Sequence, residues 1–363
     1  MNKEIVSDKQ GILLVIMFIV GTSSIIITGL EAEKDLWLAI ILSILMALPM
    51  ILIYSRIHSI FLEKDLFDIV EICFGNFLGK VIGLLYTWFA FHLSSFVIRD
   101  FGEFSVVIGM RDTPMIVIMI ITAILYIWAV KEGIEVLGRV AEFFSIILVV
   151  FIYTTILLSI PNMDINNIYP VLSNGIKPVI KGAFSVFAFP FAELIIFTMA
   201  FSGFKTRKSS YTVYIYGLLI GGIIILSTSL ANILILGLDA AAIRYFPSYA
   251  AVSRLNIGNF LQRIEIIISG IFLIGGFIKG SICLLVACKG VAKIFRYKDY
   301  RFVVTPFTLL LVNLSFLLYG NVMEFFYWSF KVWPYYAFLF QVILPIIIWI
   351  TAEIKKKQFV NIK

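Results

Sequence analysis

Ten long apolar runs set the architecture of this 363-residue chain. Each run is 18 residues or longer, and charged residues interrupt only two of them, one at Glu193 and one at Lys279. A helix needs about 20 apolar residues to cross a bilayer, whereas a barrel strand would show about ten residues that alternate in polarity. The sequence therefore predicts an all-α integral membrane protein with ten transmembrane helices. They are expected within residues 11–30, 36–55, 81–98, 113–130, 143–163, 182–204, 209–238, 266–288, 302–323 and 332–352.

The amino-acid composition indicates the same class. Hydrophobic residues make up 61% of the chain and charged residues 14%, whereas soluble domains have about 45–50% apolar residues. The net charge of +7 is not gathered into a basic arm, so we expect no nucleic-acid partner. Three cysteines do not make a disulfide framework. The first apolar run is too long for a signal-peptide core and has no small-residue cleavage site, so we expect it to stay as a membrane anchor.

The distribution of positive charge predicts the orientation. With the N-terminus inside, 19 of the 29 Lys and Arg residues fall in cytoplasmic segments and nine in outer segments, with Lys279 set aside as intramembrane. Cytoplasmic loops of membrane proteins carry the excess of Lys and Arg. We therefore expect a multi-pass protein with both termini in the cytoplasm.

The loop between Ile160 and Lys181 divides the ten runs into two sets of five. Within one transmembrane domain over residues 1–363, we expect a first half at 1–163, a second half at 181–353 and a cytoplasmic tail at 354–363. Because five is odd, the second half enters the membrane from the opposite side. This is the 5+5 inverted repeat of many secondary transporters.

The first expected helix of each half is interrupted, so we expect helices 1 and 6 to be broken. Residues 21–24 are small and polar inside an apolar run, and Pro190, which has no N–H to donate, must break a helix around residues 186–190. Paired interruptions of this kind indicate a binding site near the membrane midplane. Two plainer interpretations remain open, because small residues also serve close helix packing and proline kinks are common in membrane helices.

The groups at the two interruptions suit a small zwitterion such as an amino acid. A half-helix that begins at residues 21–24 would offer N–H groups to a carboxylate, while exposed carbonyls at residues 187–189 and the Glu193 carboxylate would accept from an ammonium group. Phenylalanines would form apolar walls. The candidate ligand-binding residues are Gly21, Thr22, Ser23, Ser24, Phe187, Phe189, Pro190 and Glu193.

Lys279 is the second charge expected inside the membrane. It lies too far from the cytoplasmic end of its run for the side chain to reach water, so it needs a partner or a wet cavity. We consider two roles: a fixed cation at an ion site, or a structural pair with Glu193 or an exposed carbonyl. No metal site, cofactor or catalytic residue is expected, because His58 and His92 are isolated and no Cys and His constellation is apparent.

Several segments together carry a family resemblance. They are residues 99–104, 133–135, 189–193, 246–249, 256–261 and 276–279. These segments resemble the spore germination permease family, the B subunit of germinant receptors in endospore-forming bacteria. The resemblance extends over essentially the whole chain, and the segment after the seventh expected helix is its most specific part.

The resemblance implies a fold and a role. The fold would be that of the amino acid, polyamine and organocation transporter superfamily, in agreement with the expected inverted repeat. The role would be to sense a nutrient, often an amino acid, in the inner membrane of the dormant spore, in a complex with a germinant receptor A subunit and a lipoprotein C subunit. The alternative is a secondary amino-acid transporter coupled to protons or another ion, with Glu193 or Lys279 in the coupling path.

Overall fold

The computed structural model describes residues 6–204, 206–255 and 263–360, so residues 256–261 of the family resemblance lie outside the described residues. Within these ranges the chain is helical and has no strand. The principal helices are α1 Asp8–Ser23, α2 Leu36–Ile60, α3 Leu66–Ile108, α4 Met115–Glu132, α5 Ile134–Ser159, α6 Ile176–Val186, α8 Arg207–Leu236, α11 Glu265–Ile294, α12 Arg301–Leu317 and α15 Leu344–Val360. Shorter pieces are η1 Leu30–Asp35, η2 Ile160–Asn162, η3 Ile165–Ile168, η4 Phe187–Phe191, η5 Ala192–Ile196, α7 Phe197–Ala200, α9 Leu238–Ala242, α10 Pro247–Val252, α13 Val322–Tyr327, η6 Trp328–Val332, α14 Trp333–Phe338 and η7 Leu339–Ile343.

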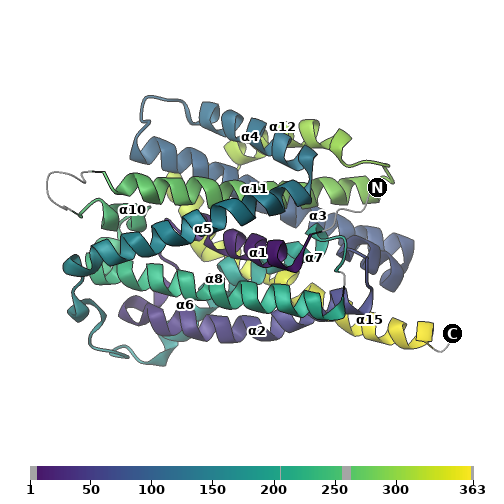
Figure 1. Ribbon diagram of the computed structural model, residues 1–363, viewed down its shortest axis with the longest axis horizontal. Helices are drawn as coiled ribbons and strands as arrows, with labels where there is room; N and C mark the ends of the chain where they lie inside the picture. Colours follow the sequence, from purple (N-terminus) through teal and green to yellow (C-terminus); the bar gives the residue numbers. More distant parts are fainter. Residues whose placement is uncertain (1–5, 205, 256–262, 361–363) are drawn as a thin grey trace.

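Every predicted apolar run overlaps one or more of these helical segments. Eight helices of the described chain are long and apolar enough to cross a membrane. The helices of the first and ninth runs are shorter, since α1 has 16 residues and α12 has 17. The all-helical membrane class is confirmed, whereas the ten-span 5+5 repeat stays a prediction. The long helices run side by side, and α1 begins at the end of the bundle where α15 ends, opposite α10 (Figure 1).

Helix α1 lies at the centre of the bundle, in contact with α5, α8 and α11. Its residues 14–23 are all buried, as expected for a helix that is apolar on every side. Gly21 allows the closest approach: a Cβ added there would lie 3.0 Å from the carbonyl oxygen of Gly275 in α11. Gly21 therefore permits close packing of α1 on α11, as one of the two plainer interpretations proposed.

The interruption after α1 differs from the expected one. The helix ends at Ser23, residues 24–29 are non-helical, and Gly29 takes a left-handed φ of 78° before η1 begins. The hydroxyl of Ser23 donates to the Ile19 carbonyl, and that of Ser24 donates to the Gly21 carbonyl at 2.8 Å. The expected half-helix does not begin here. The chain therefore presents the carbonyl end of α1, not a set of free N–H groups.

The interruption in the second half is confirmed. Helix α6 ends at Val186, and the chain continues through the π-helical turn η4, the 3₁₀ turn η5 and the single turn α7. Inside η4, Phe189 has extended angles, with φ −143° and ψ 117°, immediately before Pro190. Because proline cannot donate a backbone hydrogen bond, the break lies where the sequence predicted it.

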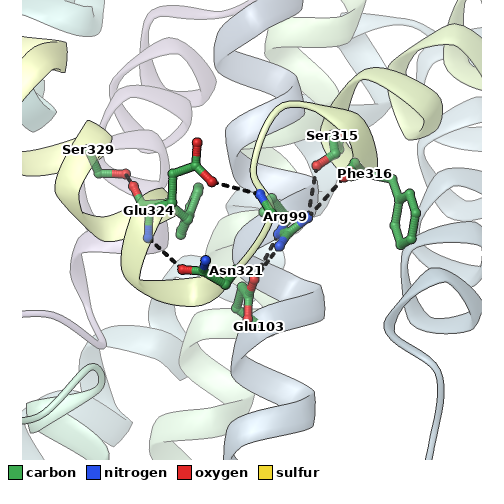
Figure 2. Close-up of polar contacts among 9 residues, drawn as sticks. Arg99, Glu103, Ser315, Phe316, Asn321, Glu324 and Ser329 are labelled. Carbon is green, nitrogen blue, oxygen red and sulfur yellow. Dashed lines mark hydrogen bonds and ion pairs between the residues drawn. The ribbon is translucent and has the colours of Figure 1, made fainter.

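Helix α3 spans 43 residues with a non-helical break at Gly75, and it continues past the expected end at residue 98, so that it carries Arg99 inside the protein. The third expected helix ended at residue 98, which left Arg99 to the following outer loop, yet Arg99 is 3% exposed. Its guanidinium donates to Glu103 Oε1 at 2.8 Å and to the carbonyls of Ser315 and Phe316 at 3.2 and 3.4 Å, at the C-terminal end of α12. Glu324 points towards the same guanidinium (Figure 2). Arg99 is thus a structural cation that joins α3 to α12.

Candidate functional site

A cavity of about 410 Å³ lies where α1 ends and where the α6–α7 segment breaks. Its walls come from residues 26–31, α3, α6, η4, η5, α11 and the segment from α13 to α14. Aromatic side chains make up much of the wall. The polar and aromatic lining residues are Thr22, Thr28, Glu31, Phe96, Asp100, Ser185, Phe189, Glu193, Arg244, Tyr245, Lys279, Phe325, Phe326, Ser329, Phe330, Lys331 and Trp333.

The cavity extends from the surface into the interior. At its mouth, Arg244 and Tyr245 are exposed, and the Lys331 side chain is 54% exposed. At its base, the side chains of Glu193 and Lys279 are both 0% exposed. The mouth belongs to the end of the bundle that carries α10, away from the start of α1 (Figure 1).

The base of the cavity holds a buried ion pair. Lys279 Nζ lies 2.6 Å from Glu193 Oε2 and 3.5 Å from Thr22 Oγ1. The ammonium group also lies over two rings, 4.3 Å from the centroid of Phe189 and 5.0 Å from that of Phe18. A cation over an aromatic face is attracted by the negative face of the ring. The structural pair between Lys279 and Glu193, one of the two roles considered from the sequence, is therefore present.

Several polar atoms around the cavity lack a hydrogen bond. Within the part of the chain that the structure describes, Glu193 Oε1, Trp333 Nε1 and Thr28 Oγ1 are buried and have no hydrogen-bond partner. The Trp333 side chain and the Glu193 carboxylate lie close enough to interact, although Trp333 Nε1 and Glu193 Oε1 are not hydrogen-bonded to each other. Buried polar groups are nearly always hydrogen-bonded. Acceptor and donor groups together lining one cavity therefore indicate a site for a polar ligand or water.

Asp100 is a second carboxylate in the wall of the cavity, on α3. Its charge interacts with those of Lys279 and Glu193, yet no described side chain hydrogen-bonds to it or forms an ion pair with it. Sequence reasoning placed Asp100 beyond the end of the third expected helix, and it did not single out Trp333 or Ser185. The charged pattern at residues 99–103 was the available signal for Asp100, because a helix that continued past Ile98 would carry Arg99 and Asp100 on different faces.

Four of the residues singled out from the sequence line the cavity, namely Thr22, Phe189, Glu193 and Lys279. The others do not. The hydroxyls of Ser23 and Ser24 are bonded to backbone carbonyls of α1, and Gly21, Phe187 and Pro190 are buried in the packing around the two breaks. Ligand contact stays a prediction for the four that line the cavity, and close helix packing accounts for Gly21.

The opposite end of the broken segment is closed. His58 Nε2 lies 3.0 Å from the carbonyl oxygen of Thr198, and buried Lys289 donates to the carbonyl of Ala200 at 2.9 Å. The ring of Phe201 contacts the rings of both Phe197 and Phe204. The broken segment therefore separates a cavity that opens at one end of the bundle from a packed region at the other.

Among the described residues there is no group of three or more His, Cys, Asp or Glu side chains arranged to hold a metal ion. The three cysteines are free and buried.

The sequence and the fold both have relatives. Residues 5–322 match the model of the spore germination protein family, a spore permease family. The chain is 29% identical over 362 residues to spore germination protein KB of Bacillus subtilis (strain 168), covering 99% of this chain and 97% of that protein. It is 22% identical over 328 residues to the putative spore germination protein YfkT of the same organism, covering 90% of this chain and 89% of that protein.

A solved structure shares the fold. It is Mhp1, a nucleobase-cation-symport-1 family transporter, in a closed conformation with bromovinylhydantoin bound. The TM-score is 0.68 at 12% sequence identity, covering 89% of this chain and 74% of that one. The likeness shows a transporter-type fold. With the family model matching most of its length, the chain belongs to the spore germination permease family.

Proposed function

We propose that this chain is the B subunit of a nutrient germinant receptor and that it binds a small nutrient, in the first instance an amino acid, in the cavity above Glu193 and Lys279. Binding would trigger spore germination. The observation that carries the proposal is the cavity itself, which leads from exposed side chains to a fully buried charged pair at the two helix interruptions. Membership of the spore germination permease family supports the role.

The proposal includes a membrane arrangement. We place the chain in the spore inner membrane as ten spans in a 5+5 inverted repeat, with both termini in the cytoplasm and the cavity mouth on the outer side. In this orientation a nutrient reaches Glu193 from outside, while the contacts of His58 and Lys289 with α7 close the cytoplasmic side. We further propose that an A subunit and a lipoprotein C subunit complete the receptor, and that the chain acts without catalysis.

The physical basis of sensing would be a shift between conformations. A ligand changes such an equilibrium only if it binds one state more tightly than the other. The α6–α7 segment is suited to this role because it holds Glu193 at the ligand side and carbonyls bound by His58 and Lys289 at the other side. A ligand that binds the Glu193 carboxylate would therefore favour one conformation of the α6–α7 segment over another.

A germination assay tests the proposal. At equal amounts of the protein in the inner membrane, spores that carry Glu193→Gln should need a higher nutrient concentration than wild-type spores for the same germination rate. Asp112→Asn is the matched control, because Asp112 is an exposed carboxylate outside the cavity. An unchanged nutrient dependence in Glu193→Gln spores would contradict the proposed site.

The second candidate function is secondary amino-acid transport coupled to protons or another ion. The observation that favours it is the fold shared with a transporter, together with a cavity open at one end and closed at the other. Proteoliposomes that contain this chain alone distinguish the two functions. Saturable uptake of labelled amino acids driven by an ion gradient would establish transport, whereas binding without accumulation is expected of a receptor subunit.

A further inference from the structure

The base of the cavity has more carboxyl groups than amino groups. Two carboxyl groups, those of Glu193 and Asp100, line the cavity together with one amino group, that of Lys279. Lys279 is bound to Glu193 Oε2 at 2.6 Å, which leaves Glu193 Oε1 buried and without a hydrogen-bond partner among the described residues. A buried carboxylate oxygen with no donor is unfavourable, so this oxygen is a position where a ligand donor would be stabilised.

Two helices end at the cavity. Helix α1 ends at Ser23 and α6 ends at Val186, and Thr22 and Ser185 in their last turns line the cavity. The C-terminal end of an α-helix behaves as about half a negative charge. The end of α1 therefore attracts a cation towards the base of the cavity, although the Ser23 and Ser24 hydroxyls bond two of its carbonyls, whereas α6 continues directly into η4.

A ligand carboxylate finds no comparable partner there. Lys279 is already neutralised by Glu193, and the Arg99 guanidinium is bound to Glu103 and to the carbonyl end of α12. The other two cations of the lining, Arg244 and Lys331, are exposed at the mouth. Because α1 ends where a half-helix was expected to begin, the N–H groups expected to bind a carboxylate are replaced by carbonyls.

The walls also suit an ammonium group. Phe96, Phe189 and Trp333 line the cavity, and the Lys279 ammonium already lies 4.3 Å from the Phe189 centroid. Aromatic faces stabilise cations, more strongly where water is excluded. The protein thus holds one ammonium group in this environment, beside a carboxylate oxygen of Glu193 that has no hydrogen bond among the described residues.

We propose that the cavity selects its ligand by a protonated amine, held between Glu193 Oε1 and the Asp100 carboxylate, and that it does not require a ligand carboxylate. The ligand class is therefore small primary amines, with amino acids as members bound through the amine. This inference rests on the proposed function, because it takes the cavity as the nutrient site.

The test compares each amino acid with the amine that lacks its carboxylate and with the acid that lacks its amino group. Purified full-length chain in nanodiscs is titrated by calorimetry with ethylamine, isoamylamine and phenethylamine, with the amino acids alanine, leucine and phenylalanine, and with the acids propionate, 4-methylpentanoate and 3-phenylpropionate. The amines that bind should bind at least as tightly as the matching amino acids, and the matching acids should not bind. Binding of an acid as tight as that of its amine would overturn the proposal, and so would the absence of binding by all three amines.

A variant assigns the binding to Asp100. Asp100→Asn keeps the shape of the side chain and breaks no bond to a described residue, so it should weaken amine binding by about tenfold or more, since charge-assisted hydrogen bonds are about twice as strong as neutral ones. Asp112→Asn, at an exposed position just beyond α3, should leave the affinity unchanged. Wild-type affinity in Asp100→Asn would refute the role of Asp100.

Spores separate this inference from the proposed function. If the purified chain binds amines but no amine or nutrient affects germination through it, the ligand class stands and the receptor role fails. If germination depends on Glu193 while the chain binds acids as well as amines, the receptor role stands and the ligand class fails.

Discussion

Breaking the ion pair between Lys279 and Glu193 tests the energetics of the cavity base. Both side chains are 0% exposed and their charged atoms lie 2.6 Å apart. At an effective dielectric constant of about 20, two unit charges about 4 Å apart attract by about 4 kcal/mol. Removing one partner from a buried pair typically destabilises a protein by about 3–5 kcal/mol, because the remaining charge is buried alone. We therefore expect Lys279→Met and Glu193→Gln each to lose about 3 kcal/mol or more of stability.

The double variant gives the decisive comparison. Glu193→Gln with Lys279→Met leaves no uncompensated charge in the pair, so it should be more stable than either single variant. The free energies of unfolding in detergent micelles, from denaturant titration followed by tryptophan fluorescence, give the coupling energy through a double-mutant cycle. We expect coupling of about 2 kcal/mol or more, whereas additivity within about 0.5 kcal/mol would refute an energetically significant pair.

Three further predictions concern packing, charge and pH. Gly21→Ala should destabilise the protein by about 1–3 kcal/mol through overpacking, because the added Cβ would lie 3.0 Å from the Gly275 carbonyl oxygen. Gly270→Ala is the control, because a Cβ there meets open space and should cause no overpacking. Equal thermal midpoints of the two variants would contradict this prediction. Arg99→Gln should lose about 3–5 kcal/mol by leaving buried Glu103 unpaired, and a thermal midpoint equal to wild type would argue against this role. Burial and the nearby Asp68 carboxylate raise the pKa of Asp65. The stability that this group contributes is present below its unfolded pKa of about 3.9 and lost as pH rises through the higher folded value. Asp65→Asn keeps an N-cap acceptor for α3. Its free energy of unfolding should therefore fall less than that of wild type between pH 4 and pH 7. An identical dependence of the free energy of unfolding on pH in the two proteins would exclude a contribution from Asp65 titration.

The sequence was informative where a residue has a strong intrinsic effect. Pro190 cannot donate a backbone hydrogen bond, so the break in the α6–α7 segment was predictable. Glu193 and Lys279 are the charges within the apolar runs, and burial in a low-dielectric interior requires that such charges have partners. Their pairing was foreseen as one of two roles, and the structure shows the pair.

The sequence was less informative where direction or tertiary contact decides. The small residues at positions 21–24 are compatible with either a helix start or a helix end. The structure has a helix end here, where Gly21 packs on Gly275 and the Ser23 and Ser24 hydroxyls bond carbonyls of α1. The C-terminal end of α3 could not be predicted, because the charged residues Arg99 and Asp100 are typical of a loop. In the structure Arg99 is buried because Glu103 and the carbonyl end of α12 bind its guanidinium. Asp100 enters the cavity as a consequence. Trp333 carries no signal in sequence, since aromatic residues are 15% of the chain.

Protection of the cavity wall by nutrient is the most direct test of the central claim. Ser185 lines the cavity from the last turn of α6, and the native cysteines are buried. In inner-membrane vesicles, Ser185→Cys should react with a small maleimide reagent, and a nutrient that triggers germination should slow this reaction. Ser253→Cys, exposed and outside the cavity lining, should react at the same rate with and without nutrient. Nutrient-dependent protection confined to Ser185→Cys would establish the cavity as the nutrient site, and an unchanged labelling rate at saturating nutrient would contradict it.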